Sequence, residues 1–274
     1  MSDEIDILTE EAVRACLSKG SPVRRVICLE TVDSTNTYAK RLAQSGAESG
    51  TLVIANQQTA GRGRRGHSFV SPPGTGLYMT LILRPTADME LFQIITVAAA
   101  VAVCLTLEAL TEARPLIKWV NDICLRCGDT GEERKVCGIL SEAVTDTGTG
   151  SVGSVVVGLG INLTTRNFGG LEGIAGSVFP EAGTKSVGRP PIAAGIAERL
   201  MDFAGRLGDP DLISAYRKRS LLLGREITYS QDGETRRARA LDVDAQGGLV
   251  VENENGQTLT LRSGEVCQVR PLKS

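Results

Sequence analysis

The sequence has almost no net charge and few aromatic residues. Its 30 Lys and Arg residues nearly balance 32 Asp and Glu residues, which leaves a net charge of −2, and Phe, Trp and Tyr make up 4% of the chain. Without a general positive field, neither nucleic acid nor an anionic membrane is attracted to the whole surface. Any anion site must therefore be a local cluster of residues.

The chain also lacks the features of a secreted protein. Its 7 cysteines are odd in number and scattered, whereas a secreted disulfide framework favours an even number in a shorter chain. The N-terminus is acidic where a signal peptide is basic. Leu91–Leu110 is about as long as a membrane span, but its alanines, Gln93 and Glu108 favour a buried core helix running to Arg114, before Pro115. We expect a cytoplasmic protein.

The length of 274 residues allows one large domain, or a medium domain followed by a small one. Helix-like and strand-like segments alternate through most of the chain. The expected helices are Glu10–Lys19, Ser34–Gln44, Leu91–Arg114, Ile192–Leu207 and Asp211–Lys218. The expected strands are Val26–Leu29, Thr51–Asn56, Leu77–Leu83, Leu116–Leu125, Lys135–Thr145 and Ser154–Leu163.

The pattern changes near Ser220. From there on, short strand-like runs are separated by turn residues, which is typical of a small β-barrel of about five strands. The runs are Glu226–Ser230, Arg236–Val243, Leu249–Asn253, Thr258–Leu261 and Val266–Arg270. We therefore predict an α+β protein with a first domain over residues 1–220 and a small barrel over residues 221–274.

The densest chemical signal is Gly61-Arg62-Gly63-Arg64-Arg65-Gly66. Its glycines let the backbone approach a ligand, and its arginines supply charge and forked donors for phosphate or carboxylate. The run predicts a loop that wraps an anion. A solvated basic turn and a nucleic-acid-binding patch are the alternatives, and the lack of interleaved aromatic residues argues against the nucleic-acid patch.

Four weaker clusters accompany this loop. Asp33-Ser34-Thr35-Asn36 is in itself an ordinary helix N-cap, and Lys118-Trp119-Val120-Asn121-Asp122 places the only tryptophan at the polar end of a strand. Lys135 opens an apolar strand, and Gly158-Leu159-Gly160-Ile161-Asn162 puts glycines inside one, which indicates close approach of another group. None of these clusters decides a function alone.

In their order, these segments resemble the biotin–protein ligase family over essentially the whole chain. The resemblance rests on Asp33–Asn36, Gln58–Gly66, Ser71–Gly74 with Leu77-Tyr78, Lys118–Asp122, Lys135–Leu140 and Gly158–Asn162. It implies a catalytic domain related to class II aminoacyl-tRNA synthetases, followed by an SH3-like β-barrel. It also implies that biotin and ATP, with Mg²⁺, give biotinyl-5'-AMP and pyrophosphate, and that biotin then passes to a lysine of a biotin carboxyl carrier protein domain.

The resemblance also assigns residue roles. Catalysis falls to Arg64 and Lys135. The residues implied in biotin binding are Ser34, Thr35, Asn36, Gln58, Arg62, Gly63, Arg64 and Lys135. Those implied near the nucleotide are Arg62, Lys118, Asn121, Asp122 and Asn162, and no protein ligand is assigned to Mg²⁺. The sequence leaves the oligomeric state open, a homodimer included.

Three positions depart from the family pattern. His67 stands where arginine is common, Phe69 where tryptophan is common, and Val120 replaces the usual proline. These changes leave the reaction in place and predict a loop that closes less tightly over the adenylate. Separately, Cys124 and Cys127, with Cys137 nearby, form a lone Cys-x-x-Cys that we do not interpret as a metal site.

Two alternatives and one expected absence complete the prediction. About 30 residues precede Asp33, too few for a winged helix-turn-helix, so we expect neither DNA binding nor repressor function. A lipoate or octanoate transferase of the same fold is the nearest alternative, and the paired arginine loop and C-terminal barrel argue against it. A non-enzymatic RNA-binding module is disfavoured by the net charge of −2.

Overall fold

The structure is a computed structural model that describes residues 6–85, 92–128, 130–145, 152–181, 186–231, 234–262 and 266–268. The helices are α1 (Glu10–Ala15), α2 (Thr35–Gln44), α3 (Phe92–Leu110), α4 (Arg189–Ala204) and α5 (Pro210–Lys218), with a 3₁₀ turn, η2 (Arg64–Gly66). The strands are β1 (Arg25–Val32), β2 (Thr51–Gln58), β3 (Gly76–Leu83), β4 (Leu116–Lys118), β5 (Asp122–Arg126), β6 (Glu133–Thr145), β7 (Val152–Asn162), β8 (Glu226–Gln231), β9 (Glu234–Val243), β10 (Leu249–Asn253), β11 (Thr258–Leu261) and β12 (Val266–Gln268).

The larger sheet has the strand order β1-β2-β3-β7-β6-β5-β4. β1 and β2 are parallel and are joined through α2, because parallel neighbours need a crossover connection. The other neighbours in this sheet are antiparallel. Val32 at the end of β1 pairs with Gln58 at the end of β2, so the chain enters α2 beside Gln58.

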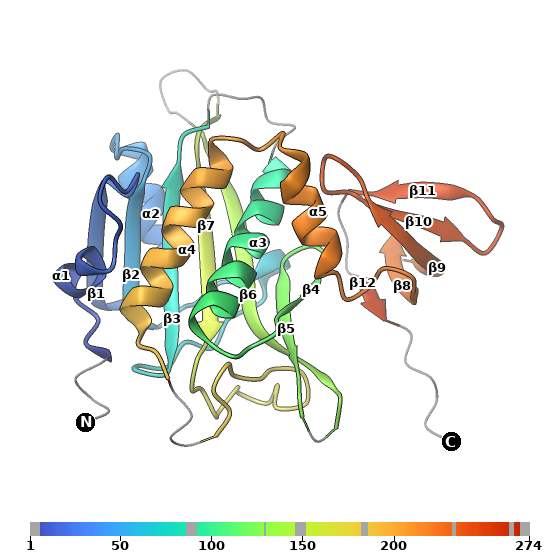
Figure 1. The fold of residues 1–274 in the computed structure, drawn as a ribbon, viewed down its shortest axis with the longest axis horizontal. Coiled ribbons are helices and arrows are strands. Elements are labelled where there is room, and N and C mark those ends of the chain that lie inside the picture. The colour runs from blue at the N-terminus through green and yellow to red at the C-terminus, as the bar shows by residue number, and fades with distance from the viewer. Residues whose placement is uncertain are drawn as a thin grey trace.

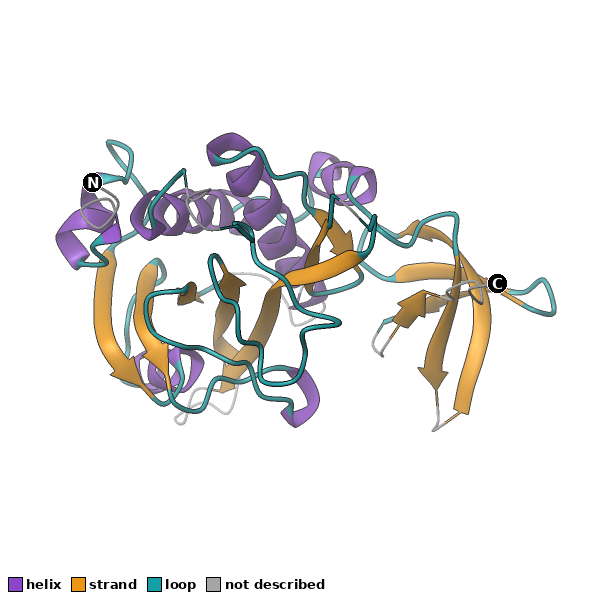
Figure 2. Ribbon diagram, turned by 90° about the horizontal axis from the view of Figure 1, so that it is seen from below, coloured by secondary structure: helices purple, strands orange, loops and turns teal. Residues whose placement is uncertain are grey.

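Helices cover both faces of this sheet (Figures 1 and 2). Because successive strand residues point to opposite faces, Leu81 and Val157 face the side of α3 and α4, whereas Ile82 and Val156 pack with Ala39 of α2. The helix segment Gln93–Leu110 is long and apolar enough to span a membrane, yet 72% of it is buried inside the protein. This finding confirms the expected core helix.

The predicted end of this helix at Arg114 is wrong by four residues, because α3 ends at Leu110. The hydroxyl of Thr111 donates to the carbonyl of Leu107 at 2.6 Å and accepts the N–H of Ala113 at 3.1 Å. Such local side-chain bonds compete with helix propagation. Similarly, α1 ends at Ala15 rather than Lys19, because Ser18 bonds to Glu198 of α4.

The predicted single strand over Leu116–Leu125 is also wrong. β4 and β5 are two antiparallel strands, with Lys118 opposite Asp122 across a turn that contains a cis Trp119–Val120 peptide bond. Asn121 bonds to Ile139 of β6 twice, through its carbonyl at 2.9 Å and its side-chain Nδ2 at 3.1 Å. These bonds hold the reversal and bring Asn121 next to the middle of the sheet.

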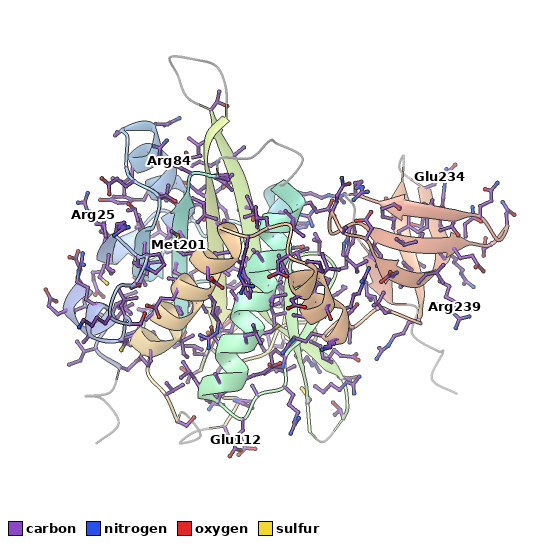
Figure 3. The ribbon with its side chains drawn as sticks, turned by 45° about the horizontal axis from the view of Figure 1, so that its top comes forward. Arg25, Arg84, Glu112, Met201, Glu234 and Arg239 are labelled. Atoms are coloured by element: carbon purple, nitrogen blue, oxygen red, sulfur yellow. The ribbon has the colours of Figure 1, made fainter. Side chains whose placement is uncertain are left out.

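The C-terminal residues form a second, antiparallel sheet in the order β11-β10-β9-β8-β12. Four of the five predicted strands are confirmed in full and the fifth over Val266–Gln268, while its last two residues lie outside the described part of the chain. This agrees with the predicted small β-barrel. Figure 3 shows Glu234 and Arg239 on the outside of this sheet, where both are exposed. The boundary near Ser220 between residues 1–220 and 221–274 stays a prediction.

Candidate active site

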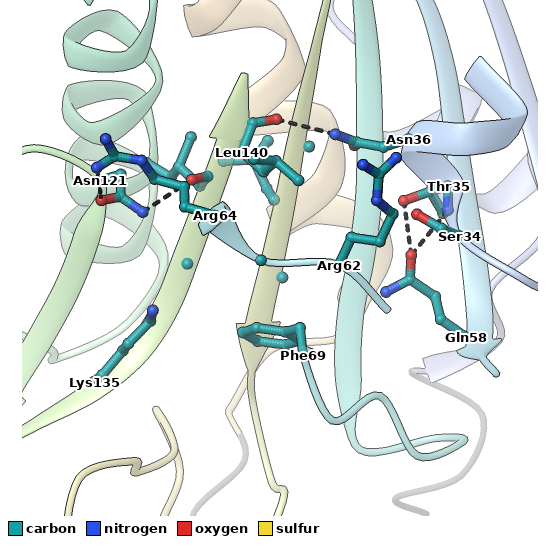
Figure 4. A pocket seen from close by; sticks show the side chains of 16 residues that line it. Ser34, Thr35, Asn36, Gln58, Arg62, Arg64, Phe69, Asn121, Lys135 and Leu140 are labelled. Atoms are coloured by element: carbon teal, nitrogen blue, oxygen red, sulfur yellow. Dashed lines mark hydrogen bonds between the residues drawn. The ribbon is translucent and has the colours of Figure 1, made fainter. Parts of the chain in front are cut away.

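A pocket with about 450 Å³ of empty space, part of it open to solvent, lies on the face of the large sheet that α2 covers (Figure 4). It is formed where β6 and β7 run beside the start of α2, the end of β2 and the glycine-arginine loop. Its lining residues are Ser34, Thr35, Asn36, Gln58, Arg62, Gly63, Arg64, Phe69, Asn121, Lys135, Gly138, Ile139, Leu140, Gly158, Leu159 and Gly160.

Three glycines make the floor of this pocket. Gly138 pairs with Gly160, and Gly158 pairs with Leu140, so the glycines share one face of neighbouring strands. A Cβ on Gly158 would lie 1.9 Å from Asn36 Oδ1, and one on Gly160 would lie 2.6 Å from the Phe69 ring. The strands must therefore lack side chains here for Asn36 and Phe69 to reach the sheet.

The start of α2 and the end of β2 form a hydrogen-bonded wall. Gln58 Oε1 accepts from the backbone N–H of Thr35 at 2.8 Å and from its hydroxyl at 3.0 Å, while Gln58 Nε2 donates to Ser71 Oγ at 2.9 Å. Ser34 is the N-cap residue of α2, but its side chain makes no capping bond. The segment is therefore more than the ordinary helix cap that its sequence alone indicates.

The glycine-arginine loop closes on itself. Gly63 N–H donates to the His67 carbonyl at 2.7 Å, and Phe69 N–H donates to the Gly61 carbonyl at 2.9 Å. Arg65 has φ 52°, in the left-handed region that non-glycine residues seldom adopt. From this loop, Arg64 Nη1 reaches Asn121 Oδ1 at 2.9 Å.

Lys135 enters the pocket from β6, and its ammonium lies 2.6 Å from Asp122 Oδ1. This carboxylate oxygen is buried, and among the described residues no other donor reaches it. The ion pair therefore holds the lysine against β5. Arg64 and Lys135, with Asn121 beside Arg64, bring cationic and amide groups to the side of the pocket opposite Gln58 (Figure 4).

Most predicted site residues converge here, but Lys118, Asp122 and Asn162 do not line the pocket. Asp122 contacts it through Lys135. Asn162 is buried at the end of β7, where its Nδ2 donates to the Gly176 carbonyl at 3.2 Å. Lys118 ends β4 outside the pocket lining.

Sequence reasoning missed two polar residues beside the pocket. Thr80 of β3 donates to Asn36 Oδ1 at 2.7 Å, and Glu142 of β6 accepts from Asn36 Nδ2 at 2.9 Å. Strand alternation could have indicated Glu142, because it follows Gly138 and Leu140 on the same face. Phe69, which stands where the family commonly has tryptophan, is itself part of the lining. Its ring packs edge-on to Tyr78 with centroids 6.4 Å apart.

Two of the cysteines near β5 and β6, Cys124 and Cys137, are buried, and Cys127 is partly buried. Burial raises the pKa of the Cys124 thiol to about 12, and it also raises the pKa of the Cys137 thiol. Within the described residues, no group of three or more His, Cys, Asp or Glu side chains is arranged to hold a metal ion.

Fold and site together define a mixed α+β protein with a small-molecule pocket that has hydroxyl and amide groups beside the Arg62–Glu142 ion pair at one end and Arg64 and Lys135 at the other. The family described as "Biotin/lipoate A/B protein ligase family" matches residues 28–162, and "Biotin protein ligase C terminal domain" matches residues 222–267. The C-terminal match favours the biotin ligases over the lipoate enzymes that the first description includes.

Individual relatives agree. The bifunctional ligase/repressor BirA of Bacillus subtilis (strain 168) is 31% identical over 256 residues, covering 91% of this chain and 76% of that protein. The biotin–[acetyl-CoA-carboxylase] ligase of Mycobacterium tuberculosis is 28% identical over 278 residues, 96% of each chain. The solved biotin protein ligase from Aquifex aeolicus in complex with biotin and ATP aligns with a TM-score of 0.72 and 27% identity, covering 90% of this chain and 100% of that chain. The chain belongs to the biotin protein ligase family.

Proposed function

We propose that this chain activates biotin with ATP and transfers it to a lysine of a biotin carboxyl carrier protein domain, as a biotin–[acetyl-CoA-carboxylase] ligase. Biotin protein ligase activity follows from the family to which the chain belongs. The observation that supports the residue roles is the pocket itself, which joins a polar wall, a glycine floor and three cationic side chains, Arg62, Arg64 and Lys135.

The polar wall suits the neutral head of biotin. In our proposal, Ser34, Thr35, Asn36 and Gln58 bind the ring system, because hydroxyl and amide groups can satisfy the donors and acceptors of its urea-like group. The glycine floor lets Asn36 and Phe69 lie against the strands, so that these two side chains can face the ligand. The biotin tail then leads towards Arg64 and Lys135.

The cationic end suits the chemistry of activation. A carboxylate oxygen of biotin attacks the α-phosphorus of ATP, the bond to the pyrophosphate leaving group breaks, and a mixed anhydride, biotinyl-5'-AMP, forms. Two anions must approach one another, and negative charge grows on the phosphate oxygens. Arg64 and Lys135 offset this charge, and fixed positioning of the reactants lowers the barrier further. Biotin is the nucleophile, so no nucleophilic side chain is required.

We propose that Mg²⁺ arrives with ATP as part of the substrate. The carboxylates beside the pocket are engaged by cations, Asp122 by Lys135 and Glu142 by Lys40 and Arg62. Mg²⁺ commonly keeps several waters and binds substrate phosphates with one or two protein carboxylates. Phosphate oxygens and water would therefore supply most of its ligands. The nucleotide roles of Arg62, Lys118, Asn121, Asp122 and Asn162 remain proposals.

The second half-reaction needs a protected intermediate. Biotinyl-5'-AMP is open to hydrolysis, so a loop that covers it retains the activated acyl group until the acceptor arrives. The self-bonded loop from Gly61 to Gly66 is suited to this role. The acceptor lysine then attacks the acyl carbon as a neutral amine, the amide forms, and AMP leaves.

We further propose that residues 1–220 form the catalytic domain and residues 221–274 the small barrel. The connection supports this division, because Arg219 and Leu221 bond with Ile117 at the edge of the large sheet before β8 begins.

Pyrophosphate exchange into ATP tests the proposed function with the full chain. We expect exchange that requires biotin and that lipoate does not support, followed by labelling of a purified carrier domain that streptavidin detects. Exchange driven by lipoate, or exchange that ignores biotin, would refute the proposal.

A further inference from the structure

Glu142 lies beside the pocket on β6, two residues beyond Leu140 and on the same face of the strand. Its side chain is 17% exposed. A half-enclosed carboxylate next to the proposed anion-binding pocket would oppose the ligand unless other groups compensate its negative charge. The contacts of Glu142 provide this compensation.

Three side chains, two from α2 and one from the glycine-arginine loop, meet at this carboxylate. Lys40 of α2 pairs with Glu142 Oε1 at 2.5 Å, Arg62 of the loop pairs with the same oxygen at 3.3 Å, and Asn36 donates to Oε2 at 2.9 Å. Burial opposes ionisation, but the bonds from Lys40 and Asn36 and the charges of Lys40 and Arg62 outweigh it and lower the pKa of Glu142.

The bond to Asn36 fixes the direction of its amide. Asn36 Nδ2 donates to Glu142 and to the Leu140 carbonyl at 3.1 Å, while its Oδ1 accepts from Thr80. The amide can satisfy these partners in one orientation only. Asn36 thus lies over Gly158 with a defined face towards the pocket.

The ion pair with Arg62 ties the loop to the sheet. Arg62 and Arg64 extend from the same loop to opposite sides of the pocket, Arg62 towards Asn36 and Arg64 towards Asn121 (Figure 4). Glu142 matches the charge of Arg62 at β6, and Arg64 bonds to the Asn121 amide. The sequence presents the two arginines as equivalent, but they contact different parts of the sheet.

We propose that Glu142 is a positioning residue that holds the loop from Gly61 to Gly66 over the pocket through Arg62. Arg62 then acts mainly as a tether, and Arg64 as the anion-facing group. The inference rests on the proposed function only for the identity of the ligand, since the tether is a property of the protein alone.

Hydrogen exchange of the ligand-free full chain tests the tether directly. Glu142→Gln keeps an acceptor for Asn36 but removes the charge that holds Arg62. We expect amides of residues 61–69 to exchange about fivefold faster, as for loss of a partly exposed ion pair. Lys40→Gln is the matched control, because Lys40 faces the same carboxylate from α2 and should leave loop exchange unchanged. Unchanged exchange in Glu142→Gln would overturn the proposal.

A double-mutant cycle separates this role from general stabilisation. In the Arg62→Ala background, Glu142→Gln should cause no further increase in loop exchange, whereas additive effects would show that Glu142 does not act through Arg62. With biotin and ATP added, Glu142→Gln should release the adenylate about fivefold faster and change the rate of its formation less. If the wild-type chain forms no adenylate, the proposed function is wrong. The hydrogen-exchange result would still show whether Glu142 holds the loop through Arg62.

Discussion

The indole N–H of Trp119 donates to the carbonyl of Gly247 at 2.9 Å, and this bond joins the turn beside the active site to the C-terminal sheet. Gln93 of α3 donates to the same carbonyl at 2.9 Å. Gly247 has φ +83°, and a Cβ there would lie 2.8 Å from Val97. The turn before β10 thus rests on α3 at a position where only glycine fits.

Replacing Trp119 with phenylalanine removes the indole donor and leaves the Gly247 carbonyl bonded to Gln93. We expect the free energy of unfolding to fall by about 1–2 kcal/mol, from one lost hydrogen bond and some lost packing. Urea denaturation followed by circular dichroism measures this. Tyr216→Phe is the comparison. The Tyr216 hydroxyl makes only a 3.4 Å bond to the Val120 carbonyl, so its loss should lower the free energy of unfolding by less. A fully stable Trp119→Phe variant would show that the bond from Trp119 to Gly247 contributes nothing to stability.

Gly158→Ala tests the glycine floor. The added Cβ would lie 1.9 Å from Asn36 Oδ1, so Asn36 must leave its three partners. We expect biotin affinity to fall by more than about tenfold, since displaced polar groups in a pocket each cost a kcal/mol or more. Titration calorimetry with biotin measures this. Gly128→Ala has open space around its Cβ and should bind biotin normally. Equal affinities in the two variants would disprove the role of the floor.

Lys135→Ala should damage both activity and folding, because it leaves the buried Asp122 oxygen without its cation. Combining Lys135→Met with Asp122→Asn removes both charges and should recover most of the melting temperature but not adenylate formation. Calorimetric melting and pyrophosphate exchange distinguish these effects. If the double variant regained pyrophosphate exchange, Lys135 would contribute to folding alone and not to adenylate formation.

The lowered pKa of Glu142 predicts a pH dependence of stability. A carboxyl whose pKa is lower in the folded than in the unfolded state stabilises the fold above its ordinary value of 4.5 and loses this contribution as pH falls through the folded value. Wild type should therefore exceed Glu142→Gln in unfolding free energy at pH 7, and the difference should shrink below pH 4.5. A difference that is constant with pH would contradict the assigned ion pairs with Lys40 and Arg62.

Local patterns in the sequence predicted most of the helices and strands, but not all of their ends and not the turn between β4 and β5. The expected helix began at Ile192, whereas α4 begins at Arg189, because proline suits the first helical turn and Pro190 is placed there. The turn between Lys118 and Asp122 depends on long-range bonds from Asn121 to Ile139, which no local pattern reveals. Helix ends at Ala15 and Leu110 were likewise set by side-chain bonds.

Most of the predicted residues come together in one pocket, whereas Lys118, Asp122 and Asn162 lie outside its lining, and the roles of all of them stay predictions. Ser34, Gln58, Arg64 and Lys135 converge because crossover and strand pairing bring the motifs together. Asn162 shares a motif with Gly158 and Gly160, but it ends β7 and turns to Gly176 instead. The looser loop closure expected from His67 and Phe69 stays a prediction.

The most direct measurement is the amount of biotinyl-5'-AMP that stays bound to the full chain after incubation with biotin and ATP and rapid gel filtration, read by mass spectrometry. We predict near-stoichiometric adenylate on the wild-type chain and little on Arg64→Ala, with similar melting temperatures for both proteins. A wild-type chain that retains biotin and ATP but no adenylate, or an Arg64→Ala variant that forms and keeps the adenylate normally, would contradict the account.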